Sequence, residues 1–307
     1  MMIRHFQTTP DDLPALARLL AAIPEFAASS EDYSEASLAA QAAAMSGSDL
    51  TRDRWVAEAP DTPGSLIGYA ALFLFPGATR ADLQIAVHPD WRRRGLGVAL
   101  LREALAEAQA RSATDANVYA SEQDAGAAAF ARAQGFTPHS AFTRLVAPQQ
   151  SFPAPSFPPG YTARACQSEE DYPRFIESAN TCYGDLWGHN PITEELGHDW
   201  FASMEPAGVC FVFGPDGALV GRSSAQIMAR DGEPSALIDA PGVVPAHRAA
   251  GLYVPLLLWE IAWSARVATP PARYIIESWG DADATLAAYQ SLGFAVETRE
   301  TAWRYPL

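Results

Sequence analysis

Apolar and polar residues change their spacing along the chain, and this separates predicted strands from predicted helices. Residues 82–87 alternate between the two kinds, with Asp82 and Gln84 on the polar side, as expected for a strand with one buried face. Residues 97–111 repeat their apolar side chains every three or four positions, which predicts a helix with one apolar stripe. The two patterns follow each other directly, so a strand leads into a long helix through residues 88–96.

The same criteria predict one order of elements over residues 1–147. A short strand and two helices come first, then three strands, the long helix, a strand, a helix and a last strand. The predicted ranges are 3–6, 12–23 (capped by Asp11 or Asp12), 35–45, 55–58, 66–75, 82–87, 97–111, 118–120, 125–133 and 142–146. This order is typical of an α/β fold, with a central mixed β-sheet flanked by helices.

The chain repeats itself around a proline-rich segment. V-H-P-D-W-R-R-R-G-L starts at Val87, and V-V-P-A-H-R-A-A-G-L starts 156 residues later, at Val243. A-A-F-A-R-A-Q-G-F ends at Phe136, and A-A-Y-Q-S-L-G-F ends 158 residues later, at Phe294. Two matches in the same order and at nearly the same offset indicate a duplicated domain.

The proline-rich segment gives the predicted boundaries. Five prolines in 148–160 and the absence of an apolar period predict a stiff, extended linker. We therefore predict two tandem α/β domains, 1–147 and 161–307. In the second, a helix at 252–267 and a strand at 274–276 repeat the long helix and the following strand.

The turn between strand and helix has the chemistry of an anion site. A helix N-terminus presents unpaired N–H groups and the positive end of the helix dipole. Gly95 and Gly97 let a ligand approach the backbone closely, and three adjacent arginines add charge-assisted hydrogen bonds. The predicted cofactor-binding residues are Val87, Arg92, Arg93, Arg94, Gly95, Leu96, Gly97, Val98 and Ala99. Taken alone, the arginines would fit a solvated charge run equally well.

The full pattern, V-x-P-x-x-[RQ]-x-x-G-x-[GA], resembles the acyl-CoA-binding signature of the GCN5-related N-acetyltransferase (GNAT) superfamily. Each half also resembles that superfamily's domain in the order and size of its elements. The resemblance implies an acetyl-CoA pyrophosphate held by N–H groups from Arg93 to Ala99. It implies a thioester between the strands at 82–87 and 118–120, and direct transfer of the acetyl group to a small amine.

The two halves differ at positions that matter for this chemistry. Arg93 and Arg94 become alanines in the second copy, Gly97 becomes Tyr253, and Ala99 becomes Pro255. These changes predict that the first half binds acetyl-CoA and that the second is a degenerate copy. Three arrangements stay open, in this order: the first half works alone, the second works with an altered turn, or the two share a site.

The catalytic candidates are divided between the halves. In the superfamily, a tyrosine four residues before the G-F glycine often protonates the departing thiolate, and Tyr289 occupies that position in the second half while Ala131 does in the first. A carboxylate would serve as base for the amine, and Asp82 and Glu58 lie on or near first-half strands. Each of the three also fits an ordinary structural role.

Composition narrows the function classes. With a net charge of −15 and a pI near 4.7, the chain is not expected to bind nucleic acid. The most apolar run, 254–263, is too short to span a bilayer, and we predict a cytoplasmic protein without membrane contact. Three widely spaced cysteines fit neither a disulfide framework nor a metal site, so no metal is predicted. The alternative function is a non-catalytic CoA-binding or sensor protein of the same fold.

Overall fold

The chain is arranged in two compact units. A computed structural model describes residues 2–8, 12–27, 33–44, 49–230, 232–267 and 269–307, so Asp11 lies outside the described residues. Unit 1 comprises residues 1–139 together with 301–307, and unit 2 comprises residues 140–300. Within the described parts of the chain, no helix is long and apolar enough to cross a membrane.

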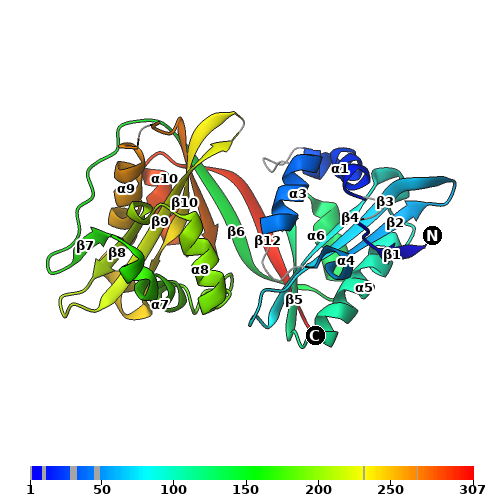
Figure 1. Ribbon diagram of the computed structural model, residues 1–307, viewed down its shortest axis with the longest axis horizontal. Coiled ribbons are helices and arrows are strands. Elements are labelled where there is room, and N and C mark those ends of the chain that lie inside the picture. Colours follow the sequence, from blue (N-terminus) through cyan, green and yellow to red (C-terminus); the bar gives the residue numbers. More distant parts are fainter. Residues whose placement is uncertain (1, 9–11, 28–32, 45–48, 231, 268) are drawn as a thin grey trace. The chain divides into compact units, whose positions relative to one another are not determined.

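Unit 1 is built on a mixed sheet with strand order β1-β2-β3-β4-β5-β12 (Figure 1). Pairing is antiparallel from β1 to β4, and β4 and β5 are parallel. The strands are β1 (Ile3–His5), β2 (Arg54–Ala59), β3 (Thr62–Phe73), β4 (Arg80–Val87), β5 (Asp115–Ser121) and β12 (Ala295–Pro306). The helices are α1 (Leu13–Ala21), α2 (Pro24–Ala27), α3 (Glu35–Ala44), α4 (Leu50–Asp53), α5 (Leu96–Ala110) and α6 (Ala125–Ala133).

The two faces of this sheet are covered by different helices. The apolar stripe of α5, with Leu100 and Leu101 fully buried, packs with α6 on one face. Leu16, Leu19 and Leu20 of α1 pack on the other. Burial of both faces accounts for the central strands being almost continuously apolar.

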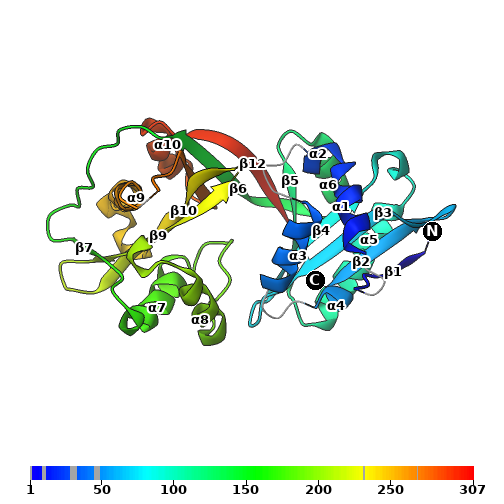
Figure 2. The same ribbon diagram turned by 45° about the horizontal axis from the view of Figure 1, so that its top comes forward.

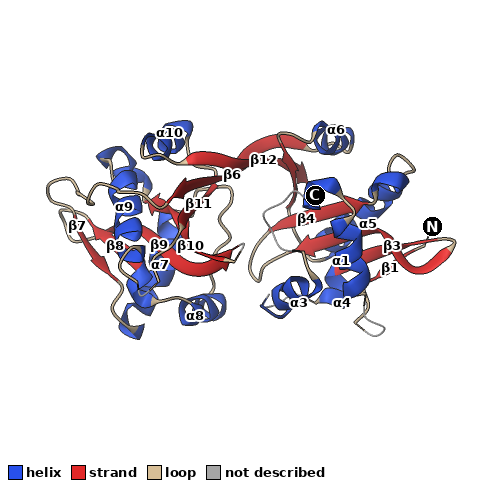
Figure 3. Ribbon diagram, turned by 90° about the horizontal axis from the view of Figure 1, so that it is seen from above, coloured by secondary structure: helices blue, strands red, loops and turns tan. Residues whose placement is uncertain are grey.

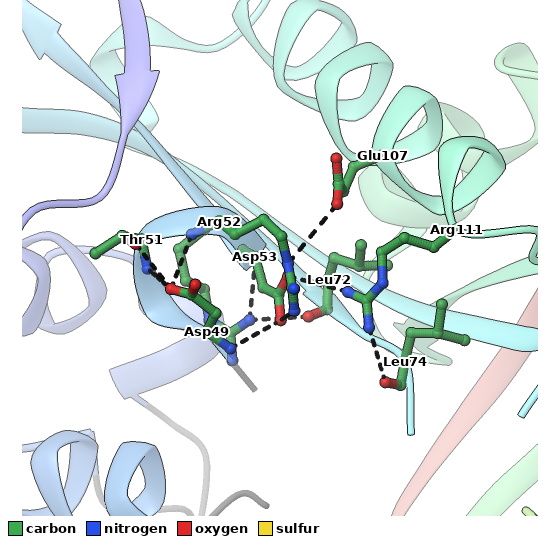
Figure 4. Close-up of polar contacts among 9 residues, drawn as sticks. Asp49, Thr51, Arg52, Asp53, Leu72, Leu74, Glu107 and Arg111 are labelled. Carbon is green, nitrogen blue, oxygen red and sulfur yellow. Dashed lines mark hydrogen bonds and ion pairs between the residues drawn. The ribbon is translucent and has the colours of Figure 1, made fainter. Parts of the chain in front are cut away.

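A buried carboxylate fixes the C-terminal end of α5. Asp53 is 2% exposed and accepts hydrogen bonds from Arg52 Nε (2.7 Å) and Arg111 Nη1 (3.0 Å) (Figure 4). Arg111 follows the last residue of α5, and its Nη2 also donates to the carbonyl of Leu74, 3.3 Å away. A buried carboxylate is tolerated only when it is paired in this way. The network ties α5 to the start of β2 and to the end of β3.

Unit 2 repeats the arrangement. Its strand order is β6-β11-β10-β9-β8-β7, with β10 and β11 parallel and the other recorded pairs antiparallel. The strands are β6 (Thr137–Pro148), β7 (Thr162–Ala165), β8 (Val209–Phe213), β9 (Leu219–Arg230), β10 (Glu233–Val243) and β11 (Arg273–Trp279). The helices are α7 (Tyr172–Cys182), α8 (Glu194–Ser203), α9 (Tyr253–Ser264) and α10 (Asp283–Ser291); α9 and α10 cover one face and α7 and α8 the other (Figure 2).

Each unit contains a strand from the other half of the sequence. Residues 142–148 of β6 pair with β11 in unit 2. Residues 301–307, which include the end of β12, belong to unit 1 (Figure 3). There, Trp303 is 4% exposed in the core, Arg304 pairs with Asp115 at 2.6 Å, and the N–H of Leu307 donates to Thr114. The predicted strand at 142–146 therefore forms, but it completes the sheet of unit 2.

The pattern-based prediction of fold class is confirmed. Both halves are mixed sheets flanked by helices, and the strand at 82–87 and the helix at 97–111 are present within a residue or two of the predicted ends. Each unit nevertheless needs one strand from the other half. The reason is that pairing along a sheet edge is set by backbone hydrogen bonds, which leave little trace in the apolar pattern.

The exchanged strands predict that neither half folds alone. A fragment of residues 1–147 lacks β12 and exposes the edge of β5, and a fragment of 149–307 lacks β6. We expect neither fragment to show a cooperative thermal transition by circular dichroism, and their mixture to recover one. A full chain cleaved at a protease site inserted into 151–156 keeps both strands, and should elute as one species and melt like the intact protein. Cooperative melting of fragment 1–147 within a few degrees of the intact chain would contradict the exchange.

Candidate active site

The signature loop of unit 1 leaves β4 at Val87 and enters α5 at Leu96. Gly95 stands at the N-cap with a φ of 81°, a conformation that side chains with a Cβ adopt only at a cost. Arg93 is a non-glycine residue with a φ of 64° in the same turn. Strained backbone of this kind is concentrated at functional loops.

The loop presents free backbone donors. The first intrahelical bond of α5 runs from the N–H of Ala99 to the carbonyl of Gly95, 3.1 Å away. The N–H groups of Leu96, Gly97 and Val98 precede it and have no intrahelical partner. Ala99, which the sequence placed among the phosphate ligands, therefore uses its N–H inside the helix. The donors available to an anion end at Val98.

The three arginines of the loop have different roles. Arg92 donates through Nε to the carbonyl of Val87 (3.2 Å) and through both Nη atoms to Glu25 (3.0 and 2.8 Å). Arg94 stacks its guanidinium over the ring of Trp91. Arg93 and Arg94 are exposed beside the free N–H groups. They are the charged side chains of this loop best placed to meet a phosphate.

The parallel strands β4 and β5 part next to this loop. Their recorded pairs end at Leu83 and Val118, whereas β4 continues to Val87 and β5 to Ser121. Beyond the last pair, the backbones of the two strands are no longer paired with each other. A slot of this kind offers backbone donors and acceptors on both sides to an extended, amide-containing ligand.

The two carboxylates predicted in unit 1 lie far apart. Asp82 is opposite Phe73 of β3, and Glu58 of β2 is opposite Leu66. Leu66 and Phe73 are seven residues apart along β3, so the positions of the two carboxylates are separated by roughly 23 Å along the sheet. Asp82 accepts a hydrogen bond from Tyr119 at 2.8 Å, at the closed end of the slot.

Glu58 is committed to an ion pair. Its Oε1 accepts from Nε and Nη2 of Arg4, at 2.8 and 2.6 Å, and the N–H of Gly64 approaches Oε2 at 3.3 Å. The Arg4 guanidinium holds the pKa of Glu58 below its ordinary value, so the carboxylate is a weak proton acceptor.

Unit 2 has a second loop with the same backbone plan. Gly251 has a φ of 76°, matching Gly95, and α9 starts two residues later. Arg248 donates through Nε to the carbonyl of Val243 (3.0 Å) and through both Nη atoms to Asp185 (2.7 and 2.5 Å). Pro255 stands where Ala99 stands in unit 1. The first intrahelical bond of α9 runs from the N–H of Leu256 to the carbonyl of Leu252, 3.1 Å away, so Pro255 lies in the first turn, and the N–H groups left for an anion there are those of Tyr253 and Val254.

The substitution of Gly97 by Tyr253 is balanced by a second one. In unit 1, a Cβ built on Gly97 would stand 3.4 Å from the ring of Phe130 on α6. In unit 2, the residue matching Phe130 is Ala288, and Tyr253 packs against the apolar core beside it. The aromatic ring has moved from one helix to the other. Tyr253 is therefore partly buried against this core.

A β-bulge changes the strand that leads into the second loop. Between Asp239 and Gly242 the chain advances three residues, while its partner strand advances two. The extra residue brings Asp239 opposite Ser224, the position that Gln84 takes opposite Ala71 in unit 1. Bulges re-aim side chains, and they are frequent next to active sites.

Asp239 stands where the slot of unit 2 begins. It is exposed, accepts from Ser224 Oγ at 2.6 Å, and forms the last recorded pair of β10 and β11 with Glu277. Sequence comparison does not single it out, because the gapless offset of 156 residues aligns Asp239 with Leu83, and the bulge makes its structural counterpart Gln84, which is not acidic. An acidic residue within a predicted strand of the second half is the available signal.

Tyr289 lies buried in unit 2 with its hydroxyl unpaired. Its side chain is 0% exposed, and among the described residues neither its hydroxyl nor Oδ2 of Asp281 has a hydrogen-bond partner. Burial raises the pKa of Tyr289, and the charge of Asp281 raises it further, so the phenol stays protonated at neutral pH. Buried polar atoms without partners are rare, and a bound molecule would satisfy them. Ala131 is the counterpart in unit 1.

Comparison with known proteins agrees with this geometry. Residues 14–136 match the profile of the acetyltransferase (GNAT) family. Mycothiol acetyltransferase of Mycobacterium marinum is 28% identical over 269 residues, which cover 79% of this chain and 80% of that protein. The protein of the same name from Mycobacterium sp. (strain JLS) is 28% identical over 266 residues, covering 83% and 84%.

Solved structures share the fold over most of the chain. A GCN5-related N-acetyltransferase from Sphaerobacter thermophilus superposes with a TM-score of 0.78 at 23% identity, over 99% of this chain and 95% of its own. A tandem GNAT protein from the clavulanic acid biosynthesis pathway gives a TM-score of 0.59 at 23% identity, over 83% and 82%. In the described residues, no group of three or more His, Cys, Asp or Glu is placed to hold a metal ion. The chain therefore contains an acetyltransferase (GNAT) domain at residues 14–136 and has the tandem GNAT fold, and its relatives support an acetyl-CoA-dependent N-acetyltransferase.

Proposed function

We propose that both units have a loop for acetyl-CoA and that the acetyl group is transferred in unit 2. The observation that carries the proposal is the buried, unpaired hydroxyl of Tyr289, which belongs to the same unit as the slot that begins at Asp239. Unit 1 has Ala131 and Gln84 at these two positions. Unit 1 has the loop with three arginines, residues 92–99, and we assign to that loop the binding of one acetyl-CoA.

The residues of unit 2 supply both proton transfers that the reaction needs. Acetyl-CoA, when bound, supplies the acetyl group as a thioester. The carboxylate of Asp239 accepts the proton that the attacking amine gives up as the C–N bond forms. The hydroxyl of Tyr289 donates a proton to the sulfur as the C–S bond breaks. Free N–H groups at the start of α9 and the positive end of its dipole favour the pyrophosphate.

The acceptor is a small amine, and the relatives suggest where to look for it. Two proteins named mycothiol acetyltransferase match four fifths of the chain, so we propose an amine of the mycothiol-related class. A strongly acidic protein favours the approach of a cationic amine over that of an anion. The acidic segment between α1 and α3 includes residues 28–32, which lie outside the described residues. We retain a cytoplasmic location as part of the proposal.

Removing the hydroxyl of Tyr289 tests the assignment of the acid. Tyr289→Phe keeps the buried ring and removes the proton donor, so kcat should fall by roughly 10²–10⁴-fold, with the acetyl-CoA dissociation constant nearly unchanged. Tyr119→Phe removes a hydroxyl beside the slot of unit 1 and is the matched control, with kcat expected near that of the wild type. Steady-state rates of thiol release measure both. The opposite ranking of the two variants would place the reaction in unit 1.

A double substitution tests whether Tyr253 closes its loop. Gly97→Tyr alone should weaken acetyl-CoA binding at unit 1, because the new ring collides with Phe130 and displaces the start of α5. Gly97→Tyr combined with Phe130→Ala reproduces the pair found in unit 2 and should restore binding to within a few fold. Calorimetric titration with acetyl-CoA reports the number of sites and their affinity. If the double variant binds no better than Gly97→Tyr, the tyrosine itself blocks the pyrophosphate, and the loop of unit 2 is degenerate.

A further inference from the structure

The first arginine of the signature makes the same three contacts in both units. In unit 1, Arg92 reaches back to the carbonyl of Val87 and forward to Glu25. In unit 2, Arg248 reaches back to the carbonyl of Val243 and forward to Asp185. In both cases Nε bonds the strand end and the two Nη atoms bond the two oxygens of one carboxylate.

The carboxylates occupy equivalent places although the residues differ. Glu25 lies four residues after the end of α1, and Asp185 lies three residues after the end of α7. Each is therefore in the segment that follows the first helix of its half. The paired arginine lowers the pKa of each carboxyl, so both are ionised at neutral pH. The contact occurs in both copies of the repeated domain although the acid differs. It therefore belongs to the architecture of each unit.

In unit 2 the carboxylate belongs to a segment that surrounds the slot. We define this segment, residues 183–189, as the strap. At one end, the hydroxyl of Tyr183 donates to the carbonyl of Ala240 in the bulge, and its ring covers Gly242, where a Cβ would stand 2.5 Å away. Further on, the ring of Trp187 packs against Trp279, the last residue of β11. The strap thus contacts the ends of both strands that frame the slot.

We propose that the signature arginine is a positioning residue that links the cofactor loop to the strap, and that the Arg248–Asp185 ion pair holds the strap in the conformation that receives the amine. The proposal rests on the proposed function for the choice of unit 2 as the reacting unit. Nε and one N–H of each Nη of Arg248 are engaged by Val243 and Asp185, so in this proposal the pyrophosphate relies on backbone N–H groups of the loop. Loss of the ion pair leaves the loop but frees the strap, which must then be ordered when the amine binds.

Asp185→Asn is the direct test, because it removes the charge and keeps the shape. We expect the KM for the amine to rise about three- to tenfold, in keeping with a partly exposed bidentate pair. The acetyl-CoA dissociation constant and kcat should stay within about twofold of the wild-type values. The melting temperature should stay within a few degrees. Asp185→Glu imports the acid that unit 1 uses and should restore the KM. Asp199→Asn removes an exposed charge from α8 and is the control.

The salt dependence of the KM distinguishes an ion pair from a contact that acts by packing alone, because added salt does not screen a packing contact. The ion pair is 30% and 48% exposed on its two sides, so added salt should weaken it and raise the KM of the wild type, with a smaller rise in Asp185→Asn. Tighter acetyl-CoA binding by Asp185→Asn would overturn the inference, because it would show that the released arginine is a phosphate ligand. An unchanged KM in both Asp185→Asn and Glu25→Gln would also overturn it. A raised KM in Glu25→Gln alone would support the linking role and refute the choice of unit 2.

Discussion

Parallel strands that stop hydrogen bonding halfway along their length are the constraint on which this structure depends. In unit 2, β10 and β11 pair up to Asp239 and Glu277 and no further, and the bulge in β10 begins at the same residue. The end of this pairing opens the sheet at one place and leaves backbone groups without partners. β10 leads from that opening into the signature loop and the N-terminus of α9, and we propose that the buried Tyr289 serves the same opening. If β10 and β11 were paired to their ends, there would be no opening in which one ligand could contact all of these groups.

The two units of the duplicated chain carry different parts of the proposed site. Unit 1 has three arginines at its loop, a continuous strand without a bulge, and Gln84 and Ala131 where proton transfer would need acid and base. Unit 2 has two alanines in its loop, together with the bulge, Asp239 and Tyr289. The exchange of β6 and β12 makes the two units interdependent for folding, because each sheet includes a strand encoded in the other half. If the acetyl group is transferred in unit 2 as proposed, unit 1 is still expected to be needed for folding.

The sequence predicted those features that depend on local pattern. The signature from Val87 to Ala99, the helix that follows it and the position of Tyr289 could be read from spacing and residue type. Asp239 was missed, because a bulge inserts one residue and an ungapped alignment cannot show it. The ion pair of Arg92 joins residues 67 positions apart, and only the folded chain brings them together. The pairing of Tyr253 with Ala288 is hidden from the sequence for a similar reason, since Ala288 lies on another helix.

The central claim is that the carboxylate at the opening of unit 2 serves the reaction and that the one in unit 1 does not. The most direct measurement compares kcat for Asp239→Asn and Asp82→Asn across a range of pH. The account predicts a fall of roughly 10²–10⁴-fold for Asp239→Asn and nearly wild-type behaviour for Asp82→Asn at every pH. A large loss in Asp82→Asn with an active Asp239→Asn would contradict the account and return the chemistry to unit 1.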